Sequence, residues 1–452
     1  MIQAVLRKFK KDASFGELVK GFGVSFILKG LGIVTAFAFT WYVARRLGAE
    51  SLGIFTIVAS VANIGVIIGR MGFNNSLVKL IASQYSKGKY ALSNLIFQKS
   101  IKLTVLFGFA TSTLLFIFAH PIARQIFDKP FLGSYFKLAS FAIIPIIISH
   151  VIAAYLRGAK EIMKFAFIVD FAHHFFRLII FAFAIIFVMH VGLPVYSWMM
   201  SWVLLMITAA IFYIRIAKLK SLKVVKDNVI GTMPLLKLSF PMFLTSSMHF
   251  LLIQTDNIMI GIFAETEEVG IYRVAVQIAT VASITLFANR AMAAPKFAEM
   301  YEKKDMKGLK HVIQQSTLLV LFSSLPLILG ILFFSDFLLS FFGGNFVIAK
   351  TALIILTLSQ LINSFTGLVG IILIMTGKHV VVQNIMLFCA LLNLVLNFIF
   401  IQYWGIAGAA IATTVSMTLK NLIAFYYVRK HLGFYSIPLR AVFFDFKKPK
   451  QD

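Results

Sequence analysis

Five charged side chains deep inside the long apolar stretches of this 452-residue sequence are candidates for chemistry. Three are cations, Lys29, Arg177 and Arg273, and two are carboxylates, Asp170 and Asp256. An ionisable group in membrane hydrocarbon costs at least about 2.5 kcal/mol, so it normally faces a partner or a water-filled cavity. Because the cations outnumber the carboxylates, this set favours binding of an anion such as phosphate or diphosphate, to which Arg offers a fork of donors and Lys a point charge.

Uncharged polar side chains accompany these charges at helical spacing. Gln277 follows Arg273 by one helical turn, and Thr56 and Asn63 lie 217 residues before positions 273 and 280. We therefore predict that the two polar stripes face each other across a shared cavity. The predicted ligands of an anionic substrate in that cavity are Lys29, Arg177, Arg273, Gln277, Thr56 and Asn63, and the predicted ion-coupling residues are Asp170 and Asp256.

Each deep polar residue also has a structural interpretation. Asp170 and Arg177 share one helix face, so an intramembrane ion pair that locks the helix is as compatible with the pattern as a substrate role. Arg273 lies close enough to a predicted helix end for its guanidinium to reach the interface between membrane and water. For Asn393 and Asn397, hydrogen bonding between helices is favoured over contact with a ligand.

Composition indicates a membrane protein. Hydrophobic residues make up 60% of the chain and include 48 Phe, and the mean hydropathy is +0.91, whereas soluble domains are about half apolar. The net charge of +26 sits between the apolar segments, so we predict no nucleic-acid partner. The single Cys389 excludes an intramolecular disulfide, and the histidine pair at 173–174 lacks further soft ligands, so we predict no metal site.

Twelve apolar segments are long enough to cross a bilayer as helices, which takes roughly 20 residues. Cationic and non-cationic loops alternate between them, and the positive-inside rule then places both termini in the cytoplasm. The apolar run after Lys20 is too long for a signal peptide and is predicted to be the first span. The predicted spans are 21–43, 52–69, 100–119, 134–155, 165–189, 194–214, 238–263, 270–291, 314–334, 348–373, 380–401 and 406–427.

An internal repeat organises these spans. Gly53-Ile54-Phe55 returns 217 residues later as Gly270-Ile271-Tyr272, and other short matches keep nearly the same offset. We predict an N-terminal lobe over residues 1–220, a Lys-rich cytoplasmic linker over 221–237, and a C-terminal lobe over 238–452. Six spans per lobe bring both lobes into the membrane from the same side, so the repeats are predicted to be parallel.

Several kinds of chemistry lack their motifs. The sequence contains no phosphate-binding loop of the Gly-x-x-x-x-Gly-Lys-Ser/Thr type and no Gly-x-Ser-x-Gly. We therefore predict a protein that is not an enzyme, with no catalytic residues and no cofactor, and not a pump driven directly by ATP.

Two stretches resemble a known family. The first is 44–55, Ala-Arg-Arg-Leu-Gly-Ala-Glu-Ser-Leu-Gly-Ile-Phe, followed by Arg-Met-Gly-Phe at 70–73. The second is Asp-Asn-Ile-Met-Ile-Gly at 256–261, followed by Val-Gly-Ile-Tyr at 269–272 and Pro-Lys-Phe-Ala-Glu-Met-Tyr at 295–301. Together they resemble the polysaccharide-biosynthesis flippases that export O-antigen and related units, in the multidrug/oligosaccharidyl-lipid/polysaccharide (MOP) exporter superfamily.

The resemblance implies an all-α integral membrane protein with about 12 transmembrane helices in two homologous six-helix lobes, arranged as the V-shaped bundle of the multidrug and toxin extrusion (MATE) transporters. It implies alternating access around a cavity lined by spans one, two, seven and eight, and transfer of a polyprenyl-diphosphate-linked oligosaccharide from the cytoplasmic to the outer leaflet of the cell membrane. Expected partners are that lipid-linked oligosaccharide, membrane lipids, H⁺ or Na⁺, and the polysaccharide assembly machinery.

Three alternatives have specific objections. A multidrug antiporter of the same superfamily binds cations and would favour deep acidic residues, whereas this chain offers mostly deep cations. A lipid II-type flippase has two further spans, which are not found after Arg429. A non-transporting assembly scaffold would not need the polar stripes.

Overall fold

The computed structural model describes residues 13–219 and 231–437, and in these ranges the chain forms helices and turns without any β-strand. The helices divide into two compact units, Met1–Ser247 and Met248–Asp452. The predicted all-helical fold class is confirmed.

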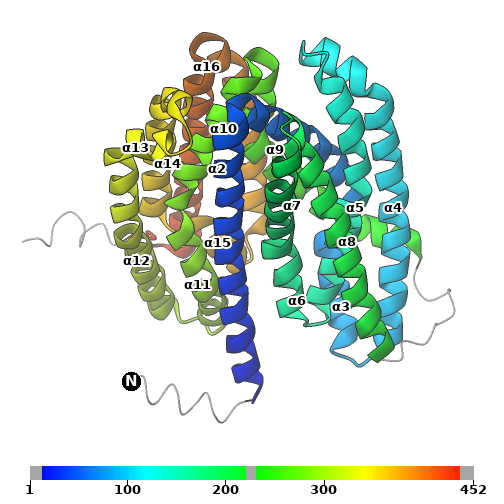
Figure 1. The fold of residues 1–452 in the computed structure, drawn as a ribbon. Coiled ribbons are helices and arrows are strands. Elements are labelled where there is room, and N and C mark those ends of the chain that lie inside the picture. Colours follow the sequence, from blue (N-terminus) through cyan, green and yellow to red (C-terminus); the bar gives the residue numbers. More distant parts are fainter. Residues whose placement is uncertain (1–12, 220–230, 438–452) are drawn as a thin grey trace, which may run out of the picture. The chain divides into compact units, whose positions relative to one another are not determined.

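The first unit contains the N-terminal half of the chain and the residues that follow it up to Ser247 (Figure 1). Its helices are α2 (Ala13–Arg70), α3 (Phe73–Tyr85), α4 (Tyr90–Pro121), α5 (Leu132–Gly158), α6 (Ile162–Ala166), α7 (His173–Phe187) and α8 (Leu193–Leu219), with π-helical segments η1 (Ile122–Ile126) and η2 (Phe167–Ala172). The next helix, α9 (Thr232–Phe263), contributes its first half to this unit.

The second unit contains the rest of α9 and the helices that follow it. They are α10 (Thr266–Val281), α11 (Ile284–Glu302), α12 (Met306–Phe333), α13 (Ser335–Ser340), α14 (Lys350–Thr366), α15 (Val369–Met375) and α16 (His379–Leu432), with a 3-10 segment η4 (Gly344–Ala349).

Two of the longest helices are each broken at a glycine. Gly48 in α2 has φ 80° and ψ −176°, and Gly405 in α16 has φ 52° and ψ −132°. Positive φ values strain residues that carry a Cβ, so glycine is the residue that can reverse the chain there. Each break separates two predicted spans: Gly48 lies between 21–43 and 52–69, and Gly405 lies between 380–401 and 406–427.

The long apolar helices among the described residues can be counted as twelve candidate spans. Nine are long and apolar enough to cross a membrane, and the bent pair α10 and α11 makes ten when it is counted as one span. Two of the nine are split at Gly48 and Gly405, so counting their halves separately gives the twelve spans predicted from the sequence.

Two predicted spans are less regular than expected. The eighth, predicted as continuous over 270–291, bends by 49° between α10 and α11. The tenth, predicted over 348–373, is interrupted at Gly367, where φ is 70°. A Cβ at Gly367 would lie 2.4 Å from the Thr317 hydroxyl oxygen, so the interruption accompanies a close approach of α12.

The boundary between the two units falls inside α9, after Ser247. The first half of α9 joins the first unit through α3, because the hydroxyls of Ser76 and Ser239 are hydrogen-bonded at 2.6 Å. Most of the predicted linker over 221–237 lies outside the described residues, and α9 begins at Thr232 within its last part.

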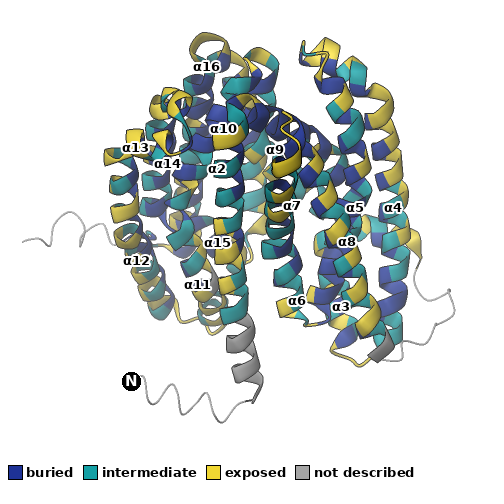
Figure 2. Cartoon of the chain, in the orientation of Figure 1, coloured by how far each residue is buried: buried dark blue, intermediate teal, exposed yellow. Residues whose placement is uncertain are grey.

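Helix α5 forms the centre of the first unit and is buried along most of its length, whereas α4 keeps an exposed face (Figure 2). Small residues let α2 and α4 approach α5 closely. A Cβ at Gly69 would lie 2.5 Å from the Ile147 side chain and 3.0 Å from the Gly108 backbone. Such close approach through small residues is typical of helix packing in membranes.

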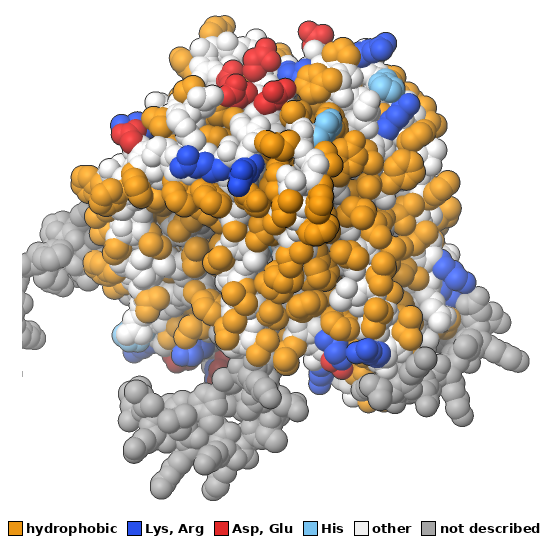
Figure 3. Space-filling model, in the orientation of Figure 1, with side chains coloured by type: hydrophobic (Ala, Val, Ile, Leu, Met, Phe, Trp, Pro, Cys, Tyr) orange, Lys and Arg blue, Asp and Glu red, His pale blue; other side chains and the backbone are white. Residues whose placement is uncertain are grey.

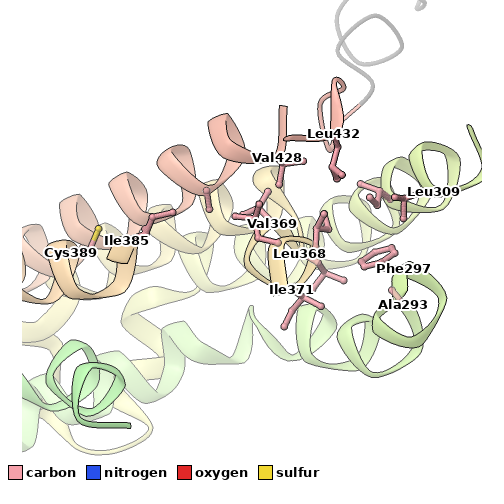
Figure 4. Close-up of a cluster of buried hydrophobic side chains, with 14 residues drawn as sticks. Ala293, Phe297, Leu309, Leu368, Val369, Ile371, Ile385, Cys389, Val428 and Leu432 are labelled. Carbon is pink, nitrogen blue, oxygen red and sulfur yellow. The ribbon is translucent and has the colours of Figure 1, made fainter. Parts of the chain in front are cut away.

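The second unit has its own apolar core, drawn in Figure 4. Phe297 of α11 is fully buried there against Leu309 of α12, and Val428 and Leu432 of α16 enter the same cluster with Leu368 and Val369. The single cysteine, Cys389, is part of this cluster and is buried.

Outward-facing helix surfaces are apolar. Phe183, Ile186 and Phe187 of α7 are 65%, 73% and 71% exposed, a degree of apolar exposure that water would disfavour and lipid would not. On the face drawn in Figure 3, hydrophobic side chains cover the middle of the helices, and Lys and Arg gather near helix ends. This distribution fits a multi-pass membrane protein.

Candidate functional site

Asp256 is the centre of a buried hydrogen-bond network in the second unit. Its side chain is 5% exposed. One carboxylate oxygen, Oδ2, accepts hydrogen bonds from the hydroxyls of Tyr272 (2.7 Å) and Thr413 (2.6 Å), and the other, Oδ1, accepts one from the Asn397 amide (2.8 Å). Asp256 forms no ion pair with any described residue.

Four helical segments meet at this carboxylate. Asp256 comes from α9 and Tyr272 from α10, while Asn397 and Thr413 come from the two halves of α16, before and after the break at Gly405. The reversal at Gly405 is therefore what brings Asn397 and Thr413 to the same group. Asn393, one turn before Asn397, donates its amide to the Thr413 hydroxyl oxygen at 3.2 Å.

Oxygen atoms dominate the interior of this network. The amide oxygens of Asn393 and Asn397 are buried and accept no hydrogen bond, while their nitrogens are used as donors. A buried carboxylate surrounded only by neutral groups is costly unless it binds a proton or a cation. Carboxylate, amide and hydroxyl oxygens are the ligands that a hard cation prefers.

The sequence predicted Asp256 as an ion-coupling residue, but it did not identify the partners. In the sequence, Tyr272 belongs only to the internal repeat, and Asn393 and Asn397 are expected to form hydrogen bonds between helices. The i, i+4 spacing of the two asparagines was the available signal, since it places both amides on one helix face. Among the described residues there is no group of three or more His, Cys, Asp or Glu side chains that could hold a metal ion.

Arg177 lies inside the first unit among aromatic rings. Its side chain is buried at 8% exposure, and its guanidinium carbon lies 4.0 Å from the ring centroid of Phe39 and 5.3 Å from that of Phe55. These rings come from the two halves of α2, so a cation–π contact ties α7 to both. An Arg177 nitrogen also lies 3.4 Å from Nδ1 of His174.

The neighbouring His173 is held by different partners. Its ring stacks on Trp202 of α8 with centroids 3.9 Å apart, and its Nδ1 lies 3.1 Å from the Ser201 hydroxyl. The cluster therefore joins α7 to α2 on one side and to α8 on the other.

Replacing Arg177 with alanine is expected to lower the free energy of unfolding by about 2 kcal/mol, the value of a desolvated cation–π contact. A matched control is Arg46→Ala, because the exposed Arg46 guanidinium lies 5.9 Å from the Tyr42 ring centroid, and an exposed pair is worth about 0.5–1 kcal/mol. Thermal unfolding of the purified protein in detergent measures both. Equal losses of unfolding free energy in the two variants would show that the buried contact stabilises the protein no more than the exposed one does.

Lys29 and Asp170 belong to the contact between α2 and η2. Asp170 is half-buried in the π-helical segment, Lys29 is exposed on α2, and the Lys29 charge acts on the Asp170 carboxylate. Gly32, close by on α2, packs directly on the backbone of Asp170. Asp170 forms no ion pair with Arg177 or any other described residue.

The remaining predicted ligands occupy two units. Thr56 is buried in the first unit and donates its hydroxyl to the Leu52 carbonyl at 2.8 Å, while Asn63 is half-buried. Arg273 and Gln277 are half-buried on α10 of the second unit, and the Gln277 amide oxygen is buried without a hydrogen-bond donor. Thus Lys29, Thr56, Asn63 and Arg177 belong to the first unit, and Arg273 and Gln277 to the second.

Two family models match the chain. The one described as polysaccharide biosynthesis protein matches residues 18–301, more than half of the chain, and the one described as MatE matches residues 241–399. A curated relative is the probable low-salt glycan biosynthesis flippase Agl15 of Haloferax volcanii, which is 30% identical over 177 residues covering 38% of this chain and 37% of the relative. The chain aligns with between about a third and a half of the length of the curated relatives it matches.

Solved structures share the fold over most of the chain. The lipid II flippase MurJ in an inward closed conformation gives a TM-score of 0.73 at 15% identity, covering 91% of this chain and 87% of that one. An inward-facing multidrug resistance MATE transporter of the MOP superfamily gives 0.71 at 15% identity, covering 90% and 94%.

Proposed function

Because the chain belongs to the polysaccharide biosynthesis protein family, we propose that it moves a lipid-linked oligosaccharide from the cytoplasmic to the outer leaflet of the cell membrane. The carrier lipid would be a polyprenyl diphosphate, and the movement would follow alternating access. The flippase named among the curated relatives supports the class of substrate, and the MOP-type fold supports the class of motion.

One observation on α10 carries the mechanism. Tyr272 donates its hydroxyl to Asp256, and the next residue, Arg273, puts a cation at a half-buried position of the same helix. Successive residues of a helix point about 100° apart, so any change of the network around Asp256 that moves Tyr272 also moves Arg273. Helix α10 would therefore couple the proposed ion site at Asp256 to the proposed anion site at Arg273.

In the proposed cycle, the cations Lys29 of the first unit and Arg273 of the second are ligands for phosphate oxygens. Gln277, Thr56 and Asn63 are ligands for sugar hydroxyls. Arg177 acts through its charge rather than through contact, because the Phe39 ring covers its guanidinium. Outward movement of an anion is favoured by an inside-negative potential, by about 2.3 kcal/mol per charge for each 100 mV.

For ion coupling we favour Asp256 over Asp170. The Asp256 network offers oxygen ligands and no cation, so a proton or Na⁺ can neutralise it. Asp170 differs in having two cations, Lys29 and Arg157, whose charges act on its carboxylate. Both termini would lie in the cytoplasm, and the assembly machinery for the polysaccharide would take up the product.

The MatE match over residues 241–399 favours one other function, a cation-coupled multidrug antiporter. The buried Arg177 and half-buried Arg273 oppose it, because a cationic drug would be repelled by both. Efflux of an organic cation from liposomes, without movement of lipid-linked oligosaccharide, would decide in favour of the antiporter.

Purified protein in liposomes is expected to transfer a fluorescently labelled lipid-linked oligosaccharide between leaflets, and Arg273→Ala is expected to slow that transfer about tenfold, equivalent to about 1.4 kcal/mol of lost binding. Quenching of the label by a membrane-impermeant reductant measures the transfer. The control is Lys303→Ala, whose side chain is exposed and paired with Glu299. No transfer by the unmodified protein would refute the proposed function, and unimpaired transfer by Arg273→Ala would remove Arg273 from the site.

A further inference from the structure

A cavity of about 470 Å³ opens in the first unit, and none of the residues assigned above to the diphosphate lines it. Its polar lining consists of Arg157, Lys160, Ser25 and Asp170, with the ring of Phe165 beside them. The cavity lies at the helix ends that the loop charges predict to face the cytoplasm. A substrate arriving from that side would meet it early.

The turn after α5 builds the cationic wall. Helix α5 ends at Gly158, where a Cβ would lie 2.7 Å from the Ile81 side chain of α3, so the helix end is pressed against α3. The chain then reverses with Lys160 at φ 66°, fixed by a hydrogen bond from the Glu161 amide to the Leu156 carbonyl at 2.9 Å. This reversal presents Arg157 and Lys160 together at the cavity.

The two cations that line the cavity, Arg157 and Lys160, differ from the next cation along the chain. Lys164, a few residues on, is neutralised by Glu161 at 3.0 Å and does not line the cavity. Arg157 and Lys160 form no ion pair with a described residue, and the Arg157 guanidinium is positioned 5.2 Å from the centroid of the Phe165 ring. Loop cations are ordinary in a membrane protein, but here two without an ion-pair partner among the described residues share a cavity with a carboxylate.

The other wall carries different chemistry. It consists of α2, with Ser25, and the π-helical η2, with Asp170. The two segments touch backbone to backbone at Gly32, where a Cβ would lie 1.7 Å from the Asp170 carbonyl oxygen. π-helical turns inside α-helices occur frequently at functional sites.

These two walls suit the two parts of a sugar phosphate. Arg157 and Lys160 match phosphate oxygens, to which an Arg donates a fork of hydrogen bonds and a Lys a compact charge. The Asp170 carboxylate would repel a phosphate but accepts hydrogen bonds from sugar hydroxyls, and the Ser25 hydroxyl oxygen lies in the same wall. A ligand with a phosphate at one end and hydroxyls at the other satisfies both walls.

We propose that this cavity binds the glycosyl-phosphate end of the lipid-linked saccharide at the membrane surface, before the substrate reaches the residues deeper in the spans. The inference rests on the proposed function and deepens it by naming a first recognition site. It assigns the phosphate to Arg157 and Lys160 and the sugar ring to Asp170 and Ser25.

Binding of a soluble probe tests the site apart from transport. Isothermal titration of the purified protein in nanodiscs is expected to show binding of glucose 1-phosphate and weaker binding of inorganic phosphate. The double variant Arg157→Gln/Lys160→Gln is expected to weaken both by at least tenfold. Asp170→Asn is expected to lower the preference for glucose 1-phosphate over inorganic phosphate, because it alters only the sugar side. The control Lys164→Gln, next to the cavity but outside its lining, is expected to bind as the unmodified protein does.

Several results would overturn the assignment. One is unchanged binding in the Arg157/Lys160 double variant, and another is an equal loss of binding in Lys164→Gln. A third is that nanodiscs rich in phosphatidic acid compete for the cavity as strongly as glucose 1-phosphate does. The last result would assign the cavity to lipid phosphates in general. If glucose 1-phosphate binds as predicted but liposomes show no transfer, the proposed function fails and the site stands. If transfer occurs while the double variant binds and transfers normally, the site fails and the function stands.

Discussion

Replacing Asp256 with asparagine is expected to leave the protein folded and to reduce the effect of a cation gradient on transfer by about 5–150-fold, the usual range of coupling between two sites. The carboxamide keeps the shape of the side chain. Its oxygen can still accept from the Asn397 amide, and its nitrogen can donate to the hydroxyls of Tyr272 and Thr413, which can turn to accept. Only the negative charge is lost, so a proton or Na⁺ has nothing to neutralise.

The alanine variant separates charge from structure at the same position. Asp256→Ala leaves the donors of Tyr272, Thr413 and Asn397 buried without their acceptor, and each such loss costs about 1–3 kcal/mol. We therefore expect a clearly lower unfolding temperature for Asp256→Ala than for Asp256→Asn.

The measurement is transfer of the labelled lipid-linked oligosaccharide with and without an imposed Na⁺ or proton gradient. Asp336→Asn is the control, because Asp336 is an exposed carboxylate paired with Lys350 at 2.6 Å. A cation response in Asp256→Asn equal to that of the unmodified protein would mean that the network only locks α9, α10 and α16 together.

The main architecture was predictable because a bilayer imposes simple demands on sequence. Each span must be apolar over a helix length, and chain reversals at Gly48 and Gly405 need positive φ, which glycine provides at little cost. Irregular helices were not predictable. The interruption at Gly367 and the π-helical turn at Phe167–Ala172 depend on contacts with other helices, and within an apolar run such residues resemble any lipid-facing segment.

The same limit applies to the candidate sites. The sequence singled out Asp256 because a carboxylate in an apolar run is rare, but its partners Asn397 and Thr413 lie 141 and 157 residues away. Arg177 was identified for the same reason, yet nothing in the sequence distinguishes Phe39 and Phe55, whose rings flank it, from the rest of the 48 Phe. Arg157 and Lys160 resembled ordinary loop cations until the turn after α5 placed them in a cavity.

The contact between Gly32 and η2 gives the second large expected effect. A Cβ at Gly32 would lie 1.7 Å from the carbonyl oxygen of Asp170 and 2.9 Å from its carbonyl carbon. Both are backbone atoms that cannot rotate away, so Gly32→Ala must separate α2 from η2. Overpacking of this kind typically costs about 1–3 kcal/mol and occasionally more.

Gly30→Ala is a closely matched control, because Gly30 lies on the same helix and a Cβ there would meet no atom within 4 Å. Alanine is favoured over glycine inside a helix by about 0.5–1 kcal/mol, so Gly30→Ala should be neutral or slightly stabilising. Thermal unfolding in detergent should therefore separate the two variants by several degrees. Gly32→Ala should also lose glucose 1-phosphate binding, because η2 carries Asp170 into the cavity wall. Identical stability and binding in the two variants would show that α2 and η2 do not make this backbone contact in the membrane.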